Sequence, residues 1–552
     1  MPMARHLKKL LCIVLVMFML VGCAPTSPSN TPYNSIENVE ARLAQYAQLG
    51  SSPDDNYRTW YEIFVYSFCD SNGDGIGDLQ GVISKLDYLE ELGINGIWLM
   101  PIHPSTSYHK YNVDNYYEID PQYGTMADFD QLMSECNKRG IKVILDLVVN
   151  HCGAENPWFT EVVEYLQWLD PWEEPSVEDC KYYGYFTFDT KMKDGYHKVP
   201  QTQYYYEGQF SSDMPDLNWA NEDVRADVKA IMEFWLNKGV GGFRVDAAKE
   251  FYSGAVNKNC EVMSWLQQTA TSIKEDVYMV AEVWEPGYST LASYYKSGFT
   301  SMFNYAYGNN TGKLIATLNC RGVPAMVSDW AVEMETITKA YEKKNPDYID
   351  APFLSNHDVG RIYDFVSGDP LRIKMAGAMN VLMSGSVFIY YGEEIGMAAN
   401  DNVNDPSKRA PMYWNKDRNQ GTTTQPPGCT LPAEGYPMGS LEEQKTDGSS
   451  IYNYYRELIA IRNALPVISH GKISVETDLN KECVSAMRKT WNDQECIILM
   501  NIDEKTAPTI DLSGYADWKL VAGLSANGEA IAMDGTNLTL PSYGVAILIP
   551  NQ

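Results

Sequence analysis

Short apolar runs and amphipathic segments alternate along most of the chain between residues 57 and 457. A strand buried on both faces is a short apolar run, whereas a helix that covers a sheet repeats its apolar residues every three or four positions. The predicted strands include Tyr61–Phe68, Gly96–Met100, Lys142–Val149, Gly242–Ala247, Val277–Trp284, Ala351–Asn356 and Val387–Tyr391. The predicted helices include Leu79–Leu92, Met126–Arg139 and Asn221–Lys238. This alternation over roughly 400 residues predicts an α/β fold, a (β/α)8 TIM barrel, with a doubly wound parallel sheet as the alternative from pattern alone.

One stretch interrupts the alternation and another region follows it. Directly after the third predicted strand, the apolar residues no longer recur at a regular spacing, and the chain becomes rich in Trp, Tyr, Pro and charged residues. This change predicts an inserted domain. Beyond the barrel, the short runs Lys472–Thr477, Cys496–Asn501 and Tyr543–Ile549 predict a C-terminal antiparallel β-sandwich. The predicted domains are the barrel, residues 56–151 and 215–463, the inserted domain B, residues 152–214, and the C-terminal domain, residues 464–552.

The first 22 residues resemble a secretion signal. Three basic residues precede the apolar run Leu10–Val21, which has the length of a signal core and is short for a transmembrane helix. The residues before Cys23 resemble a bacterial lipobox, so we expect cleavage before Cys23 and lipidation of its thiol, with an ordinary signal peptide as the alternative. Residues 23–55 are then a lipid-anchored linker, because the segment is rich in Pro, Ser, Thr and Asn. These features predict a secreted lipoprotein on the extracellular face of the cell membrane.

Charge and cysteine content restrict the partners. With a net charge of −29, the chain repels nucleic acid and anionic lipid head groups and suits a neutral substrate or bound cations. We therefore expect no nucleic-acid partner, a membrane contact through the lipid anchor only, and a monomer. Of the 11 cysteines, Cys12 falls in the signal and Cys23 is the lipidation site, so an odd number remains. Cys152 and Cys180 flank an insertion and could form a bridge, which the sequence does not decide.

Carboxylates stand at the ends of several predicted strands. Hydrolysis of a glycosidic bond needs two carboxyl groups, and a barrel enzyme presents them at the carboxyl ends of its strands. Asp246, Glu282 and Asp358 occupy such positions, and Asp146 stands at a fourth strand end. Arg244 lies two residues before Asp246 and shares its face of the strand, so its guanidinium favours the ionised form that a nucleophile requires. Crowding by Asp246 and Asp358 would raise the pKa of Glu282, as a general acid requires.

Six segments resemble the signature regions of glycoside hydrolase family 13, the α-amylase family, and they occur in the family's order. The segments are GINGIWLMP (93–101), DLVVNH (146–151), MPDLN (214–218), GFRVDAAKE (242–250), AEVWE (281–285) and FLSNHD (353–358). The resemblance extends over about residues 57–552. It implies a retaining hydrolase of α-glucans in which Asp246 is the nucleophile, Glu282 is the general acid/base and Asp358 holds the distorted sugar.

The resemblance also implies four substrate-binding residues. Arg244 would orient the nucleophile, and His151 and His357 would hydrogen-bond hydroxyls of the same sugar. Tyr111, in the segment YHKYNVDNYY (108–117), would stack under the ring. For His151 and His357, the alternative is a buried imidazole satisfied by its protein neighbours.

A second group of oxygen side chains follows the first predicted strand. The segment DSNGDGIGD (70–78) places oxygen ligands at positions 1, 3, 5 and 9 with Gly at 6, as in the calcium loop of an EF-hand, although Gly81 replaces the closing Glu. Family members of the oligo-1,6-glucosidase type carry a similar loop, which implies one structural Ca²⁺. The expected ligands are Asp70, Asn72, Asp74, the carbonyl of Ile76, and Asp78. A polar turn without metal is the alternative.

Expectations about which glucosidic bond is cleaved, and at which position in the glucan chain, come only from the family resemblance. Ala247 after the nucleophile is typical of α-1,4 cleavage, and MPDLN is typical of α-amylases intermediate between oligo-1,6-glucosidases and neopullulanases. Asn112 replaces an Asp that grips the terminal sugar in exo-acting relatives. These features favour an endo-acting α-amylase on starch or maltooligosaccharides. The alternatives are an exo-α-glucosidase, a neopullulanase or a glucan transferase on the same site. A non-catalytic glucan-binding lipoprotein is disfavoured because the catalytic carboxylates are present.

Overall fold

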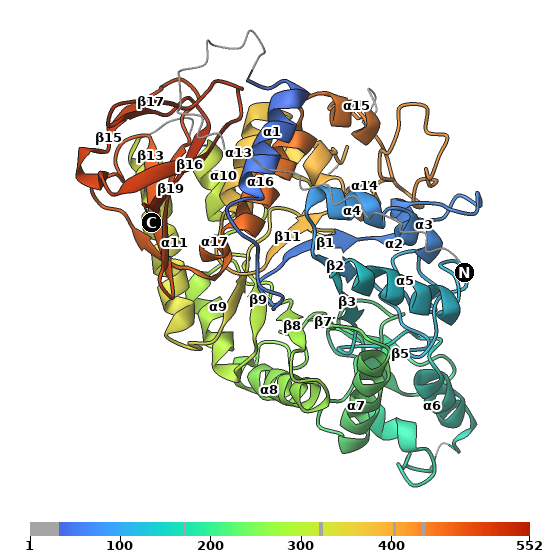
Figure 1. Ribbon diagram of the computed structural model, residues 1–552. Coiled ribbons are helices and arrows are strands. Elements are labelled where there is room, and N and C mark those ends of the chain that lie inside the picture. Colours follow the sequence, from blue (N-terminus) through green and yellow to red (C-terminus); the bar gives the residue numbers. More distant parts are fainter. Residues whose placement is uncertain (1–32, 171, 320–323, 401–403, 433–435, 552) are drawn as a thin grey trace, which may run out of the picture. The chain divides into compact units, whose positions relative to one another are not determined.

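Parallel strands form the central sheet, in the order β10-β9-β8-β7-β3-β2-β1-β11 (Figure 1). The computed structural model describes residues 33–170, 172–319, 324–400, 404–432 and 436–551. The strands are β1 (Thr59–Ile63), β2 (Gly96–Leu99), β3 (Lys142–Leu147), β7 (Gly242–Val245), β8 (Tyr278–Ala281), β9 (Ser301–Phe303), β10 (Ile349–Ala351) and β11 (Val387–Tyr390). The sheet closes where Phe353, just beyond β10, pairs in parallel with Phe388 of β11. The predicted TIM barrel is confirmed.

Helices connect the strands and cover the outside of the barrel. In Figure 1, α5 and the pair α7 and α8 lie outside β3, β7 and β8. The helices are α2 (Val65–Phe68), α3 (Leu79–Ser84), α4 (Leu86–Leu92), α5 (Met126–Lys138), α7 (Glu222–Asn237), α8 (Val256–Ile273), α9 (Tyr288–Tyr294), α10 (Lys313–Asn319), α11 (Pro324–Glu342), α12 (Ile362–Phe365), α13 (Pro370–Val381), α14 (Asp405–Lys408), α15 (Leu441–Thr446), α16 (Ile451–Ala464) and α17 (Pro466–His470). Local chemistry sets several starts: Thr125 and Asp128 form a capping box before α5, and Asn221 caps α7.

Aromatic side chains fill the inside of the barrel. Trp60 of β1 stacks on Tyr278 of β8, with ring centroids 5.0 Å apart, and also on Phe388 of β11, at 5.9 Å. Gly96 on β2 faces Trp60 so closely that a Cβ atom would lie 2.4 Å from the indole, which explains why this position has no side chain. The interior is a packed core, so ligands can enter only from the ends.

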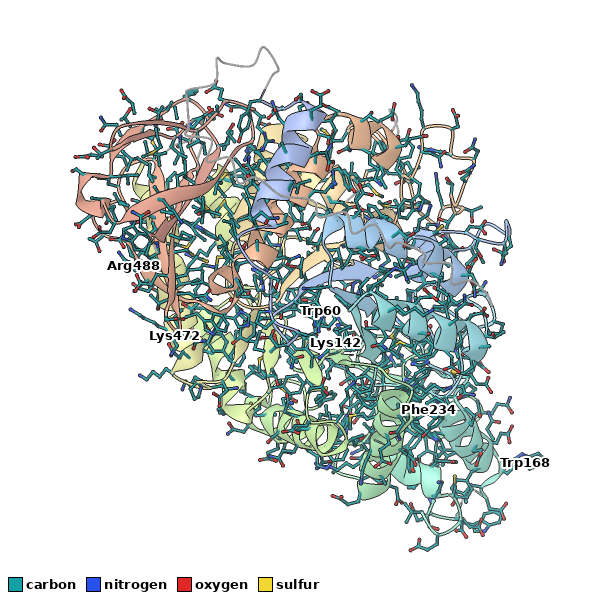
Figure 2. The ribbon with its side chains drawn as sticks, in the orientation of Figure 1. Trp60, Lys142, Trp168, Phe234, Lys472 and Arg488 are labelled. Carbon is teal, nitrogen blue, oxygen red and sulfur yellow. The ribbon has the colours of Figure 1, made fainter. Side chains whose placement is uncertain are left out.

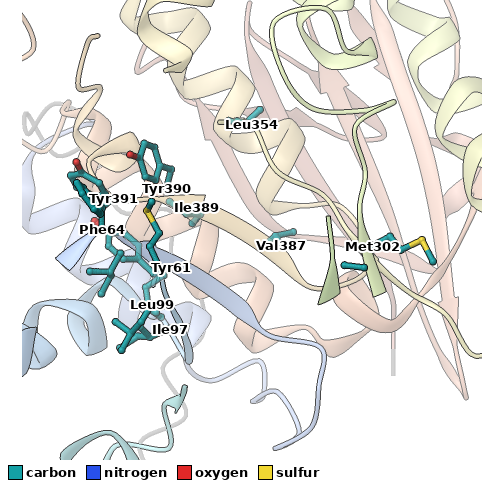
Figure 3. Close-up of a cluster of buried hydrophobic side chains, with 14 of the residues drawn as sticks. Tyr61, Phe64, Ile97, Leu99, Met302, Leu354, Val387, Ile389, Tyr390 and Tyr391 are labelled. Carbon is teal, nitrogen blue, oxygen red and sulfur yellow. The ribbon is translucent and has the colours of Figure 1, made fainter. Parts of the chain in front are cut away.

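The alternate residues of the same strands point outward and pack against the helices. Figure 3 shows part of this layer, with Tyr61, Ile97, Leu99 and Ile389 on neighbouring strands. Each such side chain is buried and contributes about 1.5–3 kcal/mol through removal of apolar surface from water. Strands buried on both faces explain why the sequence shows continuous apolar runs rather than alternation.

The inserted and C-terminal regions form their own sheets. After β3 come α6 (Pro157–Trp168) and the sheet β4-β6-β5, made of β4 (Phe188–Asp189), β6 (Tyr205–Glu207) and β5 (Tyr196–Lys198). The C-terminal region has an antiparallel sheet in the order β12-β13-β14-β19-β16 and a smaller sheet β15-β18-β17. The bounds are β12 (Lys472–Val475), β13 (Val484–Trp491), β14 (Gln494–Asn501), β15 (Thr509–Asp511), β16 (Trp518–Ser525), β17 (Ala532–Asp534), β18 (Asn537–Thr539) and β19 (Gly544–Pro550). Leu499, Ile510 and Leu538 belong to one buried cluster between these sheets, and the predicted antiparallel C-terminal region is confirmed.

The structure corrects three expectations. The predicted strand Tyr61–Phe68 is β1 followed by the short helix α2, and β9 was not predicted. The predicted linker contains helix α1 (Ile36–Tyr46), which packs against α16. Arg42 of α1 donates two hydrogen bonds to the buried Glu457, at 2.5 and 2.7 Å, so this part of the segment is anchored rather than free.

Other expectations concern the ends and the thiols. Cys23 and the signal lie outside the described residues, and among the helices that the structure describes none is long and apolar enough to span a bilayer. Cys152 and Cys180 are both free thiols.

Candidate active site

Charged side chains converge on one mouth of the barrel, at the carboxyl ends of the strands. Side chains two positions apart on a strand share a face. Three apolar residues point into the barrel: Trp60, Ile144 and Val280. Each is followed two positions later by a carboxylate, which therefore also points inward. The carboxylates reached in this way are Glu62 on β1, Asp146 on β3 and Glu282 just beyond β8. Asp246 follows β7 by the same rule, two residues after Arg244.

Arg244 joins three of these carboxylates and is itself buried. Its Nη1 atom lies 2.5 Å from Oδ1 of Asp246 and 2.7 Å from Oδ1 of Asp146, and its Nη2 atom lies 3.1 Å from Oε1 of Glu282. One planar guanidinium thus fixes the relative positions of the predicted nucleophile and the predicted acid. The other oxygen of Asp146 accepts a hydrogen bond from the indole of Trp98 at 3.0 Å.

Burial and neighbouring charges set the protonation of the two predicted catalytic groups. Burial raises the pKa of Glu282, Arg244 opposes this rise, and the charges of Asp246 and Asp358 add to it. Burial also raises the pKa of Asp246, and the close Arg244 guanidinium opposes that rise. The expected crowding of Glu282 by carboxylates therefore contributes, but burial is the larger cause.

Asp358 has the opposite environment, because two cations hold it. His357 Nε2 lies 2.8 Å from Oδ2 of Asp358, and Arg409 Nη2 lies 2.9 Å from Oδ1. Burial alone would raise the pKa of Asp358, but His357 and Arg409 outweigh it, so the pKa is lowered. On its other side, His357 Nδ1 lies 2.5 Å from the buried Glu62. Burial lowers the pKa of His357, but Asp358 and Glu62 together raise it to about 9, so this imidazole is a cation at neutral pH.

Tyr111 and His151 complete the predicted set. The Tyr111 ring stacks on His357 with centroids 5.4 Å apart, and its hydroxyl lies 3.2 Å from Asp146. Burial lowers the pKa of His151 to about 4, so this imidazole is neutral at pH 7. Within the described residues, Nε2 of His151 is buried and has no hydrogen-bond partner. It is therefore free to bond a ligand hydroxyl.

A cavity of about 750 Å³ opens over these groups. Six of the seven predicted catalytic and substrate-binding residues line it: Tyr111, His151, Asp246, Glu282, His357 and Asp358. Arg244 lies behind them, where it contacts the carboxylates. Aromatic side chains at the rim are partly exposed, with Phe210 contacting His151 and Trp284 stacking on Tyr305.

Two residues next to the pocket have unusual surroundings. Ala247 has a left-handed backbone (φ 46°), and its N–H donates to Oε2 of Glu282 at 2.9 Å. A left-handed conformation is uncommon for a residue with a Cβ atom and is typical of functional sites. Asn112 is fully buried, and its amide donates to the Asp213 carboxylate at 2.7 Å. Its side chain therefore connects two loops and does not line the cavity.

The predicted calcium loop lies between α2 and α3, apart from this cavity. Asp70 accepts hydrogen bonds from the backbone N–H groups of Gly73 and Gly75, and both glycines have left-handed backbones. Asp78 caps α3 and also accepts from Ser71. Among the described residues, no group of three or more His, Cys, Asp or Glu side chains is arranged as a metal site. The calcium ligands therefore stay a prediction.

Two neighbours of the site, Glu62 and Arg409, were not predicted, and Asp146 was predicted as a strand-end carboxylate but given no role. Each of the three contacts a predicted site residue directly. Glu62 stands at a strand end, so the rule that found Asp246 also applies to it. Arg409 comes from an irregular segment, where no hydrophobic period indicates which way a side chain points.

The arrangement suits acid–base chemistry on a neutral, hydroxyl-rich molecule. Two adjacent buried carboxyls have raised pKa values, a third is held ionised by cations, and an imidazole offers an unpartnered nitrogen. Two carboxyls that face one cavity meet the minimal requirement for cleavage of a glycosidic bond, with one as the acid and the other as the nucleophile or base.

Comparison with known proteins agrees with this chemistry. The family profile described as "Alpha amylase, catalytic domain" matches residues 62–471. The chain is 38% identical over 450 residues to "Alpha-amylase 3" of Dictyoglomus thermophilum, which covers 80% of this chain and 84% of that protein. It is 32% identical over 465 residues to the "Glucan 1,6-alpha-glucosidase" of Streptococcus pneumoniae, covering 73% and 83%.

A solved structure, "Eubacterium rectale Amy13B", has the same fold. It superposes with a TM-score of 0.88 at 40% sequence identity, and the match covers 92% of this chain and 98% of that one. The matches include proteins named for α-amylase and for α-1,6-glucosidase activity.

Proposed function

Since this chain belongs to the α-amylase family of glycoside hydrolases, we propose that it hydrolyses α-1,4-glucosidic bonds of starch or maltooligosaccharides with retention, by endo cleavage. The family establishes an enzyme acting on α-glucans, and the bond, the chain position and the residue roles are our proposal. One observation carries it: Arg244 bridges Asp246 and Glu282 at the base of the cavity, at 2.5 and 3.1 Å.

Asp246 acts as the nucleophile. The carboxylate attacks the anomeric carbon and forms a glycosyl-enzyme, while Arg244 opposes the effect of burial on its pKa and so favours the ionised form. One guanidinium contacts both catalytic carboxyls and fixes their relative position. Attack by a carboxylate rather than by water at the first step gives retention, because a second displacement follows.

Glu282 acts as the general acid and then as the general base. Its raised pKa favours the protonated form that the leaving oxygen needs, and the Ala247 N–H holds its other oxygen in place. After the leaving group departs, the ionised Glu282 takes a proton from the water that cleaves the glycosyl-enzyme.

The remaining residues hold the sugar. Asp358, which is ionised between His357 and Arg409, accepts hydrogen bonds from hydroxyl groups of the sugar ring and stabilises the oxocarbenium-like form of the sugar. His151 donates to a hydroxyl through its free Nε2, and Tyr111 presents an aromatic ring to the same subsite.

Two features support α-1,4 and endo action. Ala247 leaves a small side chain at the position where the oligo-1,6-glucosidase group carries Val. Asn112 is buried against Asp213, so it offers no grip on a terminal sugar. An α-1,6-glucosidase is the second candidate, favoured by the similarity to the "Glucan 1,6-alpha-glucosidase".

We further propose one structural Ca²⁺ in the loop of residues 70–78. The donor set fits, because Asp70, Asn72 and Asp74 are hard oxygen ligands on a loop whose backbone their side chains already organise. With Asp78 and the carbonyl of Ile76 they would hold the ion. It would stabilise the loop and take no part in bond cleavage.

The division into a barrel, a domain B of residues 152–214 and a C-terminal domain from residue 464 is part of this proposal. So are the lipid anchor at Cys23, the extracellular location and the monomeric state.

The test is the product profile over time on soluble starch, on maltotriose and on isomaltose, with Glu282→Gln as the inactive control. Mixed maltooligosaccharides early from starch, and no product from the control, are expected. Glucose alone from starch and maltotriose would replace endo with exo action, and preferential cleavage of isomaltose would replace α-1,4 with α-1,6 specificity. Full activity of Glu282→Gln would refute the assigned roles.

A further inference from the structure

Helix α6 in the inserted region carries a tryptophan that the fold does not use. Trp168, at the last turn of the helix, is 89% exposed, and Figure 2 shows it projecting outward at the edge of the molecule. The opposite face of the same helix is ordinary core, because Phe159, Val162 and Leu166 are buried. An exposed indole gains nothing from folding, and large exposed apolar groups mark interaction sites.

Trp168 is part of a shallow hollow of about 570 Å³. Glu161, Glu164, Tyr165 and Trp168 lie three or four positions apart on α6, so helical geometry places them on one face. Asp179 and Tyr182, from the segment that follows, form the other wall. None of these residues lines the cavity over Asp246 and Glu282.

The chemistry of the hollow matches a neutral sugar chain. The apolar face of a hexose packs on an indole, and carboxylates accept hydrogen bonds from its hydroxyl groups. Three carboxylates and one lysine line the hollow, so its charge is negative, as is that of the whole chain at −29; both repel anionic ligands such as phosphates, nucleic acids and acidic lipids. The Lys181 ammonium lies 4.6 Å from the centre of the Tyr182 ring. Of the three aromatic rings in the hollow, Trp168 is exposed whereas Tyr165 and Tyr182 are half-buried, so Trp168 offers the largest stacking surface.

We propose that this hollow is a second glucan-binding site, which holds a distant part of the polymer being cleaved in the catalytic cavity. This inference rests on the proposed function, because it assumes that the substrate is an α-glucan. A weak second contact on the same chain raises the local concentration of substrate without touching the bond being broken. It therefore acts on long glucans and leaves short ones unaffected.

The variant Trp168→Ala tests the proposal in the full-length protein. We expect it to raise KM for soluble starch roughly three- to tenfold, the range of one aromatic contact. Its kcat/KM on maltotriose should stay within about twofold of wild type, because a trisaccharide cannot reach both sites. Trp172→Ala is the matched control, since Trp172 is 80% exposed four residues later and is not among the residues that form the hollow.

A second measurement detects binding directly. Adsorption to insoluble starch is compared between Glu282→Gln and Glu282→Gln/Trp168→Ala, so that no substrate is consumed. Weaker adsorption of the double variant supports the proposal. Equal adsorption and an unchanged KM for starch overturn it, as does an equal loss from Trp172→Ala.

The outcomes also separate this inference from the proposed function. If wild type does not cleave maltotriose or starch, the function fails, whatever Trp168 does. If wild type cleaves both and Trp168→Ala affects both equally, the second site fails alone. A wild-type oligomer that Trp168→Ala converts to a monomer, with starch kinetics unchanged, would assign the hollow to self-association and overturn the glucan site.

Discussion

Substitution of Glu62 is a direct test of what keeps the His357 imidazole protonated beside Asp358. This buried carboxylate lies 2.5 Å from Nδ1 of His357, whose Nε2 lies 2.8 Å from Asp358. The substitution Glu62→Gln keeps the shape and a hydrogen-bonding oxygen but removes the charge. Since Asp358 and Glu62 together raise the pKa of His357, removal of one should lower it.

The size of the effect follows from the pKa of His357. The rise from 6.5 to about 9, against a burial effect that lowers it, corresponds to roughly 3 kcal/mol in favour of the imidazolium. If Glu62 supplies a third to a half of this, its loss is worth about 1–1.5 kcal/mol, or about one pH unit. The protonated imidazole holds Asp358, and it is lost as pH rises through the pKa. A lower pKa therefore moves the loss of the imidazolium toward more acid pH.

The assay is an NMR pH titration of the His357 imidazole from pH 5 to 10 in wild type and Glu62→Gln, with the resonance assigned from His357→Asn. The control is Glu394→Gln, because Glu394 is also fully buried and accepts hydrogen bonds from Tyr61 and Tyr88 rather than from His357. We expect the midpoint of the His357 titration to fall by about one pH unit in Glu62→Gln and to stay in place in Glu394→Gln. An unmoved midpoint in Glu62→Gln would refute the electrostatic role of Glu62 and leave only a structural one.

Three further predictions follow from other contacts. Arg42→Ala should destabilise the protein by about 3 kcal/mol in urea unfolding, because it leaves the buried Glu457 unpaired, and Arg42→Ala/Glu457→Gln should recover part of the loss. A chelator should lower the melting temperature of wild type by several degrees, as expected for loss of about 3 kcal/mol of ligand stabilisation, but should not affect Asp70→Asn; equal effects on both would contradict calcium in the loop. Ala247→Val adds a branched side chain at a pocket residue with φ 46°, so kcat/KM on maltotriose should fall at least about tenfold while activity on isomaltose falls less. Unchanged maltotriose kinetics would show that this position does not limit the α-1,4 substrate.

How far the sequence predicts the fold depends on the length of each element. Strands β3 and β11, which are six and four residues long and each contain four apolar residues, were found within a few positions. The three residues of β9 are too few to show a pattern. Helix α1 was missed because the surrounding Pro, Ser and Asn dominate the composition. Its stability comes from contacts with α16, more than 400 positions away, which no local pattern records.

The candidate site was predictable where a residue follows a strand, and less so elsewhere. Glu62 was overlooked because the first strand was expected to end at Phe68, which placed Glu62 in the interior of the element; the strand ends at Ile63, so Glu62 reaches the mouth of the barrel. Arg409 reaches Asp358 from a segment in which apolar residues have no regular spacing. Such contacts depend on how distant segments meet, and only the tertiary structure supplies that.

The geometry also explains why Glu282 rather than Asp246 should hold the proton. Three cationic groups, Arg244, Arg409 and His357, contact the carboxylates, and they are not shared equally. Asp358 contacts Arg409 and also His357, which it shares with Glu62, and Asp246 has the shortest contact with Arg244, at 2.5 Å. Glu282 has the longer contact, 3.1 Å, and its other oxygen meets only a neutral backbone N–H. The carboxyl least stabilised as an anion retains its proton at the highest pH, so the unequal distances to Arg244 separate the acid from the nucleophile.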